Sequence, residues 1–164
     1  MHTEAQKVKV KIVSALLKTT IPMPSYATVG SAAMDLHACC DHPIVIPAQG
    51  QAKVPTGIAI ELPQPEMVAL VFPRSGLASK YGISLSNAVG VIDSDFRGEI
   101  ICLVKNESTH DFVVNPGDRV AQLGFFPIQR VSWEEVTELE ETKRGGGGFG
   151  STGISQALNC NDKK

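Results

Sequence analysis

The sequence has no long apolar run and no large excess of charge of one sign. No stretch is apolar enough to cross a membrane as a helix, and residues 1–11 carry Glu4 and three lysines where a secretory signal has an apolar core. The 15 basic and 17 acidic residues give a net charge of −2, so no overall field draws the protein to nucleic acid or to an acidic membrane. We expect a cytoplasmic protein, or a nuclear one in a eukaryote, with neither partner.

Cysteine is scarce, with four residues in 164. Cys39 and Cys40 are adjacent and so are badly placed to pair with each other, while Cys102 lies in an apolar stretch and Cys160 in the tail. Without an export signal, we expect these thiols to be reduced. A zinc site on the adjacent pair and its flanking histidines is disfavoured, because strand alternation sends neighbouring side chains to opposite faces.

Helical periodicity is almost absent. Short apolar stretches recur at intervals of roughly ten residues with proline and glycine turns between them, which is typical of an all-β jelly roll or distorted β-barrel. Leu77–Tyr81, followed by Gly82, predicts one short helix, and the continuously apolar 67–72 predicts a buried central strand. Further strands are expected over residues 7–12 (with one face buried), 32–38, 44–46, 57–62, 112–114 and 119–128, and over part of the acidic 131–142.

Residues 1–142 suffice for one domain with its own core, and 143–164 form a glycine-rich arm that we expect to be flexible. Gly145, Gly147 and Gly150 match a dinucleotide-binding pattern, but that motif needs a strand before it and a helix after it. Free backbone N–H groups, the hydroxyls of Ser151 and Thr152, and an arginine (Arg144) instead suit a polyphosphate. Composition alone is equally consistent with a tail that binds nothing.

Residues 87–99 hold the densest chemistry. Residues 89–92 and 100–104 are β-branched and aliphatic, so the pattern predicts two strands joined by a polar turn. Gly90 and Gly98 bracket the turn, and such glycines mark a bulge or a close approach of backbone or ligand. The turn itself carries two carboxylates, an aromatic ring and a guanidinium: Asp93, Asp95, Phe96 and Arg97.

Other polar residues interrupt apolar strands. Arg74 and Ser75 stand at the end of the predicted central strand, where they are placed to bind phosphate, and Gln122 must find a partner on an otherwise apolar strand. Taken singly, Asp35 and the two aspartates of the turn are equally well explained as ordinary turn or strand-edge residues. Together these are the residue types that a nucleoside triphosphate requires.

Five motifs occur in the order found in the homotrimeric dUTP diphosphatases (dUTPases), and the chain resembles that family from Lys9 to Gly153. The resemblance implies hydrolysis of dUTP to dUMP and pyrophosphate, which keeps uracil out of DNA and supplies dUMP for thymidylate synthesis. It also implies a homotrimer with active sites between subunits. The five motifs are residues 33–36, 73–82, 90–98, 116–123 and 144–153.

The resemblance also assigns roles to residues. It makes Asp93 the general base that deprotonates the attacking water, and Asp35 the residue that holds, through water, a Mg²⁺ carried mainly by the triphosphate. Phosphate-contacting or site-ordering positions match Arg74, Ser75, Gly76, Gln122, Arg144, Gly150, Ser151 and Thr152.

In the family, uracil is read by a backbone turn that corresponds here to residues 87–92, with Asn87, Gly90, Val91 and Ile92 as contacts. Phe96 matches the aromatic residue that packs on deoxyribose and excludes a 2′-hydroxyl, and Phe149 the ring that closes over the base. Relatives usually have tyrosine at Phe96, and glycine plus an aromatic at Ala33 and Met34, so Met34 is expected to repack the wall behind Asp35.

Two other readings fit the same residues. A dCTP deaminase of similar fold is the nearest rival, and the intact 90–98 motif with Asp93 argues against it. A protein that keeps the pocket but regulates a partner belongs to a different class, and catalysis combined with such binding is compatible with the sequence.

Overall fold

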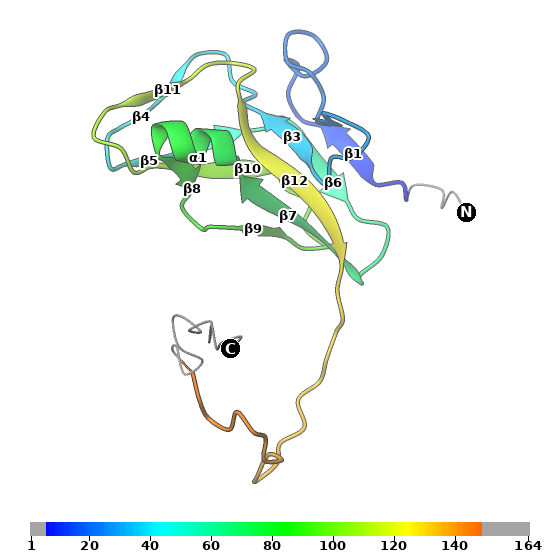
Figure 1. Cartoon of the computed structure of the whole chain (residues 1–164). Helices are drawn as coiled ribbons and strands as arrows, with labels where there is room; N and C mark the ends of the chain where they lie inside the picture. Colours follow the sequence, from blue (N-terminus) through cyan, green and yellow to red (C-terminus); the bar gives the residue numbers. More distant parts are fainter. Residues whose placement is uncertain (1–5, 149–164) are drawn as a thin grey trace, which may run out of the picture. The chain divides into compact units, whose positions relative to one another are not determined.

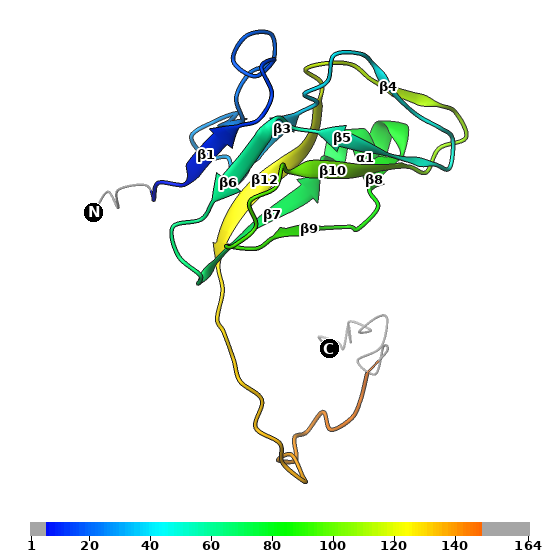
Figure 2. The same ribbon diagram turned by 180° about the vertical axis from the view of Figure 1, so that it is seen from behind.

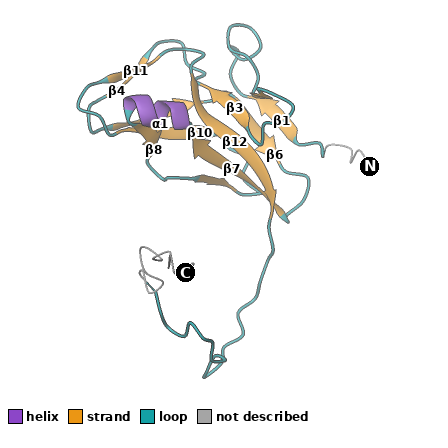
Figure 3. Cartoon of the chain, in the orientation of Figure 1, coloured by secondary structure: helices purple, strands orange, loops and turns teal. Residues whose placement is uncertain are grey.

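The computed structural model describes residues 6–148, and β-strands dominate it (Figures 1 and 3). The chain divides into two compact units, residues 1–130 and residues 131–164. The first unit contains every helix and strand of the described chain, which confirms the expected all-β class. No helix within residues 6–148 is long and apolar enough to cross a lipid bilayer.

The strands pair only antiparallel and form four sheets. The strands are β1 (Lys9–Ile12), β2 (Ser25–Tyr26), β3 (Met34–His37), β4 (Ile44–Ile46), β5 (Gln51–Pro55), β6 (Ile58–Glu61), β7 (Met67–Pro73), β8 (Ile83–Leu85), β9 (Gly90–Ile92), β10 (Ile101–Asn106), β11 (Phe112–Val114) and β12 (Arg119–Pro127). The largest sheet has the order β2-β3-β12-β7-β9, a second has β5-β10-β8, and β1-β6 and β11-β4 form pairs. The described sheets do not close into a barrel.

Both larger sheets contribute residues to one core. Along β10, Cys102, Val104 and Asn106 are buried while the residues between them are less so. From the five-stranded sheet, Leu36 and Leu123 are buried with them. Burying one such aliphatic side chain contributes about 1.5–3 kcal/mol, which explains why period-two patterns in the sequence locate the strands.

The central strand of the prediction is confirmed. β7 lies between β12 and β9, and Met67, Val68 and Ala69 are all buried. β12, the longest strand, runs between β3 and β7 (Figure 1). These two strands position the polar residues described below.

The predicted helix is also confirmed, as α1 (Ser75–Tyr81). It begins directly after Arg74, whose backbone is extended, and ends at Gly82. The φ of Gly82 is 66°, a left-handed conformation that glycine adopts without strain. Its N–H donates to the carbonyl of Ala78 at 3.1 Å, so the last turn is closed.

The predicted pairing around the polar turn is wrong. Residues 90–92 and 101–106 are strands, but β9 pairs with β7, whereas β10 pairs with β5 and β8 (Figure 2). The reason is geometric, because the intervening residues 93–100 exceed the two to five residues of an ordinary hairpin loop. The turn therefore connects two sheets.

Two further expectations differ from the structure. Residues 131–142 contain no strand in the described chain, because a strand needs a hydrogen-bonded neighbour and the described part of this unit offers none. β1 forms as predicted and pairs with β6, but all four of its residues are exposed. The expected buried face of this strand has no cover within the described chain.

Candidate functional site

Asp35 is the centre of an ion-pair cluster built by β3, β7 and β12. Arg119 donates a hydrogen bond of 3.2 Å from Nη1 to Oδ2 of Asp35, and Nε of Arg74 lies 3.2 Å from Oδ1. Arg74 Nη1 also donates to the backbone carbonyl of Arg119, at 3.2 Å. Asp35 is only 8% exposed, so salt screens this cluster less than a surface pair. One carboxylate thus holds two guanidinium groups in place.

Arg74 and Asp35 are close enough to form an ion pair, but the angle of this contact does not meet that of a hydrogen bond. Nε of Arg74 and Oδ1 of Asp35 are both buried and lack a hydrogen-bond partner within residues 6–148. Buried polar atoms in folded proteins usually have a partner, ordered water or a ligand included. The cluster therefore keeps polar atoms free to bind water or a ligand.

A β-bulge brings Arg119 into this cluster. Gln122 faces Asp35 across β12 and β3, but the register shifts between Arg119 and Ala121, so that Arg119 faces His37. In an unbroken strand, residues three apart point to opposite faces, and Arg119 would point away from Gln122. The extra residue of the bulge turns it to the same face. The sequence did not identify Arg119 as a site residue, because strict alternation along the strand would place it on the face opposite Gln122.

Gln122 lies in the middle of the same face. Its two cross-strand neighbours are Asp35 on β3 and Phe72 on β7, and Arg74 follows Phe72 by two residues. Gln122 is half-buried.

Ser75 and Gly76 form the first turn of α1, directly beside the cluster in sequence. Both are exposed, and a Cβ built on Gly76 would meet nothing within 4 Å. The end of β7 therefore presents a guanidinium, a hydroxyl and an unhindered backbone to solvent. That combination suits an anion with several oxygens.

His37 borders the cluster. Burial lowers the pKa of His37 from its ordinary value of 6.5, with Arg119 and Arg74 acting in the same direction and Asp35 opposing them. Its Nδ1 is buried without a partner in the described chain. Because the imidazole of His37 is neutral, the positive charge of the cluster comes from the two guanidinium groups alone.

The proposed base-reading turn links β8 to β9. Ala88 has a φ of 58°, and Val89 N–H donates to the carbonyl of Asn87 at 2.6 Å. Gly90, Val91 and Ile92 then form β9, which is the edge of the five-stranded sheet. Val91 is 61% exposed. Since β9 has a neighbour on one side only in the described chain, the backbone groups of its other edge are available to a ligand.

Asp93 and Phe96 occupy the turn that follows β9. Phe96 N–H donates to the carbonyl of Asp93 at 3.1 Å, and Arg97 Nη1 donates to the carbonyls of Ser94 at 2.8 Å and Phe96 at 3.0 Å. The side chain of Asp93 makes no hydrogen bond in residues 6–148, and the residue is exposed. The Asp93 carboxylate is therefore exposed to solvent, while hydrogen bonds hold the backbone of its turn.

Within one chain, the Asp35 cluster and the turn that carries Asp93 do not lie together. Ile92 faces Ala69 across β9 and β7, and the antiparallel direction carries Asp93 further away from Arg74. At about 3.3 Å per residue, the five residues from Ala69 to Arg74 span about 17 Å. The Asp35 cluster and the Asp93 turn therefore lie at separate places on the first unit.

The remaining predicted residues belong to the second unit. Arg144 is exposed and lies in a turn, where its Nε donates to the carbonyl of Gly147 at 3.0 Å. Phe149, Gly150, Ser151 and Thr152 lie outside the described residues.

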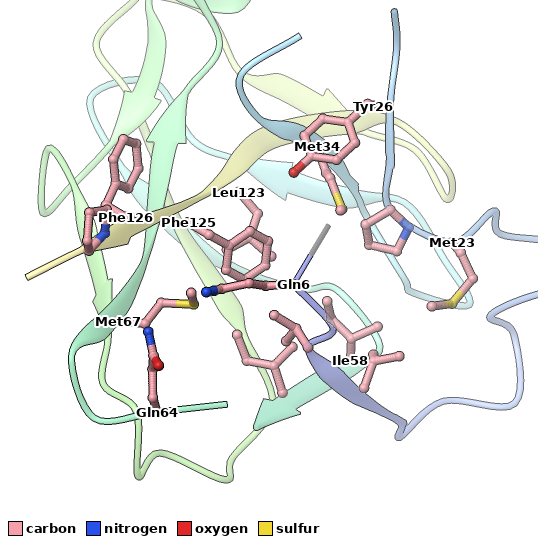
Figure 4. A pocket seen from close by; sticks show the side chains of 15 residues that line it. Gln6, Met23, Tyr26, Met34, Ile58, Gln64, Met67, Leu123, Phe125 and Phe126 are labelled. Carbon is pink, nitrogen blue, oxygen red and sulfur yellow. The ribbon is translucent and has the colours of Figure 1, made fainter. Parts of the chain in front are cut away.

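A separate apolar groove of about 630 Å³ lies on the first unit (Figure 4). Val10, Tyr26, Ile60, Phe125 and other residues line it. Figure 4 shows Met34 among the lining side chains, whereas Asp35 faces Gln122 on the other side of β3. Adjacent strand residues point to opposite faces, so Met34 lies behind Asp35 on the groove side of β3, and its repacking of that wall stays a prediction.

Comparisons with known proteins agree on one family. The family model described as dUTPase matches residues 19–153. Deoxyuridine 5′-triphosphate nucleotidohydrolase of Legionella pneumophila (strain Paris) is 48% identical over 148 residues, which is 90% of this chain and 97% of that protein. The protein of the same name from Desulfitobacterium hafniense (strain DSM 10664 / DCB-2) is 50% identical over 148 residues, 90% of this chain and 98% of its own.

Solved structures share the fold. The Staphylococcus bacteriophage 80alpha dUTPase with dUPNHPP superposes with a TM-score of 0.80 and 24% identity, over 92% of this chain and all of that one. A phage phi11 dUTPase, the D95N mutant with a structural Mg(II) ion, gives a TM-score of 0.71 over 83% of this chain and all of that one, at 22% identity. On the family match and the curated relatives, this chain belongs to the dUTPase family.

Proposed function

We propose that the protein hydrolyses dUTP to dUMP and pyrophosphate. The observation that carries the proposal is the face on which Asp35, Arg74 and Gln122 meet, with polar atoms left unpaired for a ligand. Membership of the dUTPase family supports the choice of nucleotide. The substrate is a soluble nucleotide, which supports a cytoplasmic location.

Asp93 is the proposed general base. Its exposed carboxylate can accept a proton from the water whose oxygen attacks the α-phosphorus, and pyrophosphate then leaves with the electrons of the α–β bridging bond. The backbone around it is fixed by the hydrogen bonds of Arg97 to two carbonyls of the turn. A fixed base lowers the entropy cost of orienting the water.

Arg74 is the proposed main phosphate contact, together with Ser75, Gly76 and Gln122. Arg119 and Asp35 hold its guanidinium at the end of β7. A guanidinium that is already oriented loses less conformational entropy when it binds a phosphate group.

The residues of the cluster fit a Mg²⁺ that arrives with the triphosphate. The buried Oδ1 of Asp35 lacks a hydrogen-bond partner in the described chain and could accept one from a metal-bound water. No group of three His, Cys, Asp or Glu side chains within residues 6–148 could hold a metal alone, and Mg²⁺ commonly relies on substrate phosphates and waters for most of its ligands. When bound, the ion would neutralise charge on the phosphate oxygens.

The backbone of residues 87–92 is proposed to read uracil. The open edge of β9 offers N–H and C=O groups at fixed spacing, and Asn87 lies in the tight turn before it. Fixed donors and acceptors reject a base whose edge presents the opposite groups, because the mismatched polar atoms would stay unpaired. Phe96, in the turn that follows β9, is proposed to contact the sugar.

We also propose a homotrimer with active sites shared between subunits, and the separation of the two groups supports the sharing. About 17 Å of β7 separates the ends that carry the Asp35 cluster and the Asp93 turn, which supports a site in which a second copy supplies one of the two. The apolar groove and the exposed Val10 and Ile12 of β1 supply apolar surface that copies could bury. The arm, residues 143–164 with Arg144 and Phe149 to Thr152, is proposed to close each site.

One assay tests the proposal directly. The full-length protein is incubated with dUTP, dCTP, dTTP and UTP in Mg²⁺, and pyrophosphate and ammonia are measured. We expect pyrophosphate from dUTP alone among the four at comparable substrate concentrations. Ammonia from dCTP would identify a deaminase, and absence of pyrophosphate from dUTP would refute the proposal.

A further inference from the structure

Gly98 supports the ring of Phe96. A Cβ built on Gly98 would lie 2.6 Å from Cζ, 3.0 Å from Cε2 and 3.4 Å from Cε1 of that ring. These three atoms are the closest to the built Cβ, and all belong to the far edge of the ring. The ring of Phe96 is therefore folded back over Gly98, in the space that any other side chain would occupy.

The backbone does not explain why glycine stands at position 98. Gly57, Gly82, Gly117 and Gly145 have positive φ values, but Gly98 is not among them, so an alanine could adopt its conformation without strain. The feature that excludes a Cβ is the ring itself.

Other contacts fix the backbone on which the ring stands. Arg97 binds the carbonyls of Ser94 and Phe96, and Phe96 N–H binds the carbonyl of Asp93. Phe96 has no aromatic partner in the described chain and, as a phenylalanine, no hydroxyl to anchor it. Phe96 as a whole is 41% exposed. The close approach to Gly98 is therefore one contact that sets the position of the ring.

We propose that Gly98 is a specificity-determining residue, because its missing side chain lets the Phe96 ring lie where it excludes a 2′-hydroxyl. This inference rests on the proposed function, in which Phe96 contacts the deoxyribose. A methyl group at position 98 displaces the ring edge, since a rotating ring gives way more easily than a tied backbone. A displaced ring no longer fits against C2′ as it does in the proposed function, so discrimination against a ribonucleotide falls.

The test compares Gly98→Ala with the wild-type protein in two backgrounds, native and Phe96→Ala. For each full-length protein, kcat/KM is measured for dUTP and for UTP in Mg²⁺, and thermal unfolding is recorded. In the native background we expect Gly98→Ala to lower the ratio of dUTP to UTP by about tenfold or more, the effect of misplacing a steric wall by roughly one methyl group. In the Phe96→Ala background the same change leaves the ratio unaltered.

Gly30→Ala is the matched control, because a Cβ on Gly30 meets nothing within 4 Å, and it keeps the wild-type ratio. An unchanged ratio in Gly98→Ala overturns the inference. An equal fall of the dUTP to UTP ratio in both backgrounds also overturns the inference, because Gly98 would then act without Phe96. An unfolded Gly98→Ala protein overturns it as well, since the inference requires that only the ring moves. A wild-type protein that fails to hydrolyse dUTP instead refutes the proposed function itself.

Discussion

Asp35 on β3 and Arg119 on β12 are joined by a hydrogen bond of 3.2 Å that exists only because β12 is bulged. The bond connects two strands whose residues are 84 positions apart in the sequence. It also orders Arg74, which contacts Asp35 and the Arg119 carbonyl together.

Replacing Arg119 by alanine is expected to weaken both the fold and the phosphate site. The nearly buried Asp35 would contact one arginine instead of two, and loss of a charged hydrogen bond costs about 1.5–3 kcal/mol when buried. Arg119 is itself half-exposed, so we expect a loss of about 1 kcal/mol in the free energy of unfolding. Denaturant unfolding and kcat/KM for dUTP measure the two effects.

Arg130→Ala is the control for Arg119→Ala, because Arg130 is exposed and lies outside the strands. Equal stability and activity of the two variants would show that Arg119 does not organise the cluster.

Asp93→Asn is expected to bind nucleotide and to turn it over slowly. The amide keeps the size of the side chain but cannot take a proton from water, and loss of a general base lowers the rate by about 10²–10⁴-fold. Turnover of dUTP and calorimetric binding of a non-hydrolysable dUTP analogue separate the two steps. Full activity of this variant would require another base.

Mixing two inactive variants is expected to restore activity. In an assembly of Arg74→Ala and Asp93→Asn chains, a site shared between copies can combine the native Arg74 of one chain with the native Asp93 of another. The two proteins are unfolded together, refolded and assayed with dUTP, and light scattering gives the mass of each assembly. If sites lie within single chains, or if the protein is a monomer, the mixture remains as inactive as its components.

His37→Gln is expected to reduce the loss of stability in mild acid. The folded protein holds the pKa of His37 below 6.5 through burial, so the unfolded chain binds the proton first. The stability that the neutral imidazole confers is complete above pH 6.5 and is lost as pH falls from that value through the lower folded pKa. Denaturant unfolding from pH 8 down to 5, in buffer without metal, should therefore show a flatter profile for His37→Gln.

The exposed His42 provides the control, as His42→Gln removes a histidine outside the cluster. A His37→Gln profile that overlays the wild-type profile would contradict the assigned burial effect.

Local patterns were sufficient wherever a residue's own neighbours decide its conformation. The apolar run at 67–72 formed the central β7, and Leu77–Tyr81 with Gly82 formed α1. Period-two alternation in the sequence located β3 and β6, and the apolar run at 119–128 located β12. The strands β2 and β8 were missed because residues 25–26 and 83–85 are too short to show a period. The strand β5 was also missed, and Val54 is its only buried residue.

Pairing between distant strands could not be predicted from those patterns. β9 and β10 are neighbours in the sequence, yet they lie in different sheets. The period of a strand identifies its buried face, but the partner on either edge depends on the whole arrangement of sheets.

The sequence by itself determined the all-β class, the central strand, the helix and the residue types of the candidate site, because these depend on local conformation and on burial of alternate side chains. Only the tertiary structure decided that a bulge turns Arg119 toward Asp35, that the ring of Phe96 lies over Gly98, and that Asp93 stands far from Arg74. Each of these depends on strand register and on contacts across space, which no run of neighbouring residues specifies.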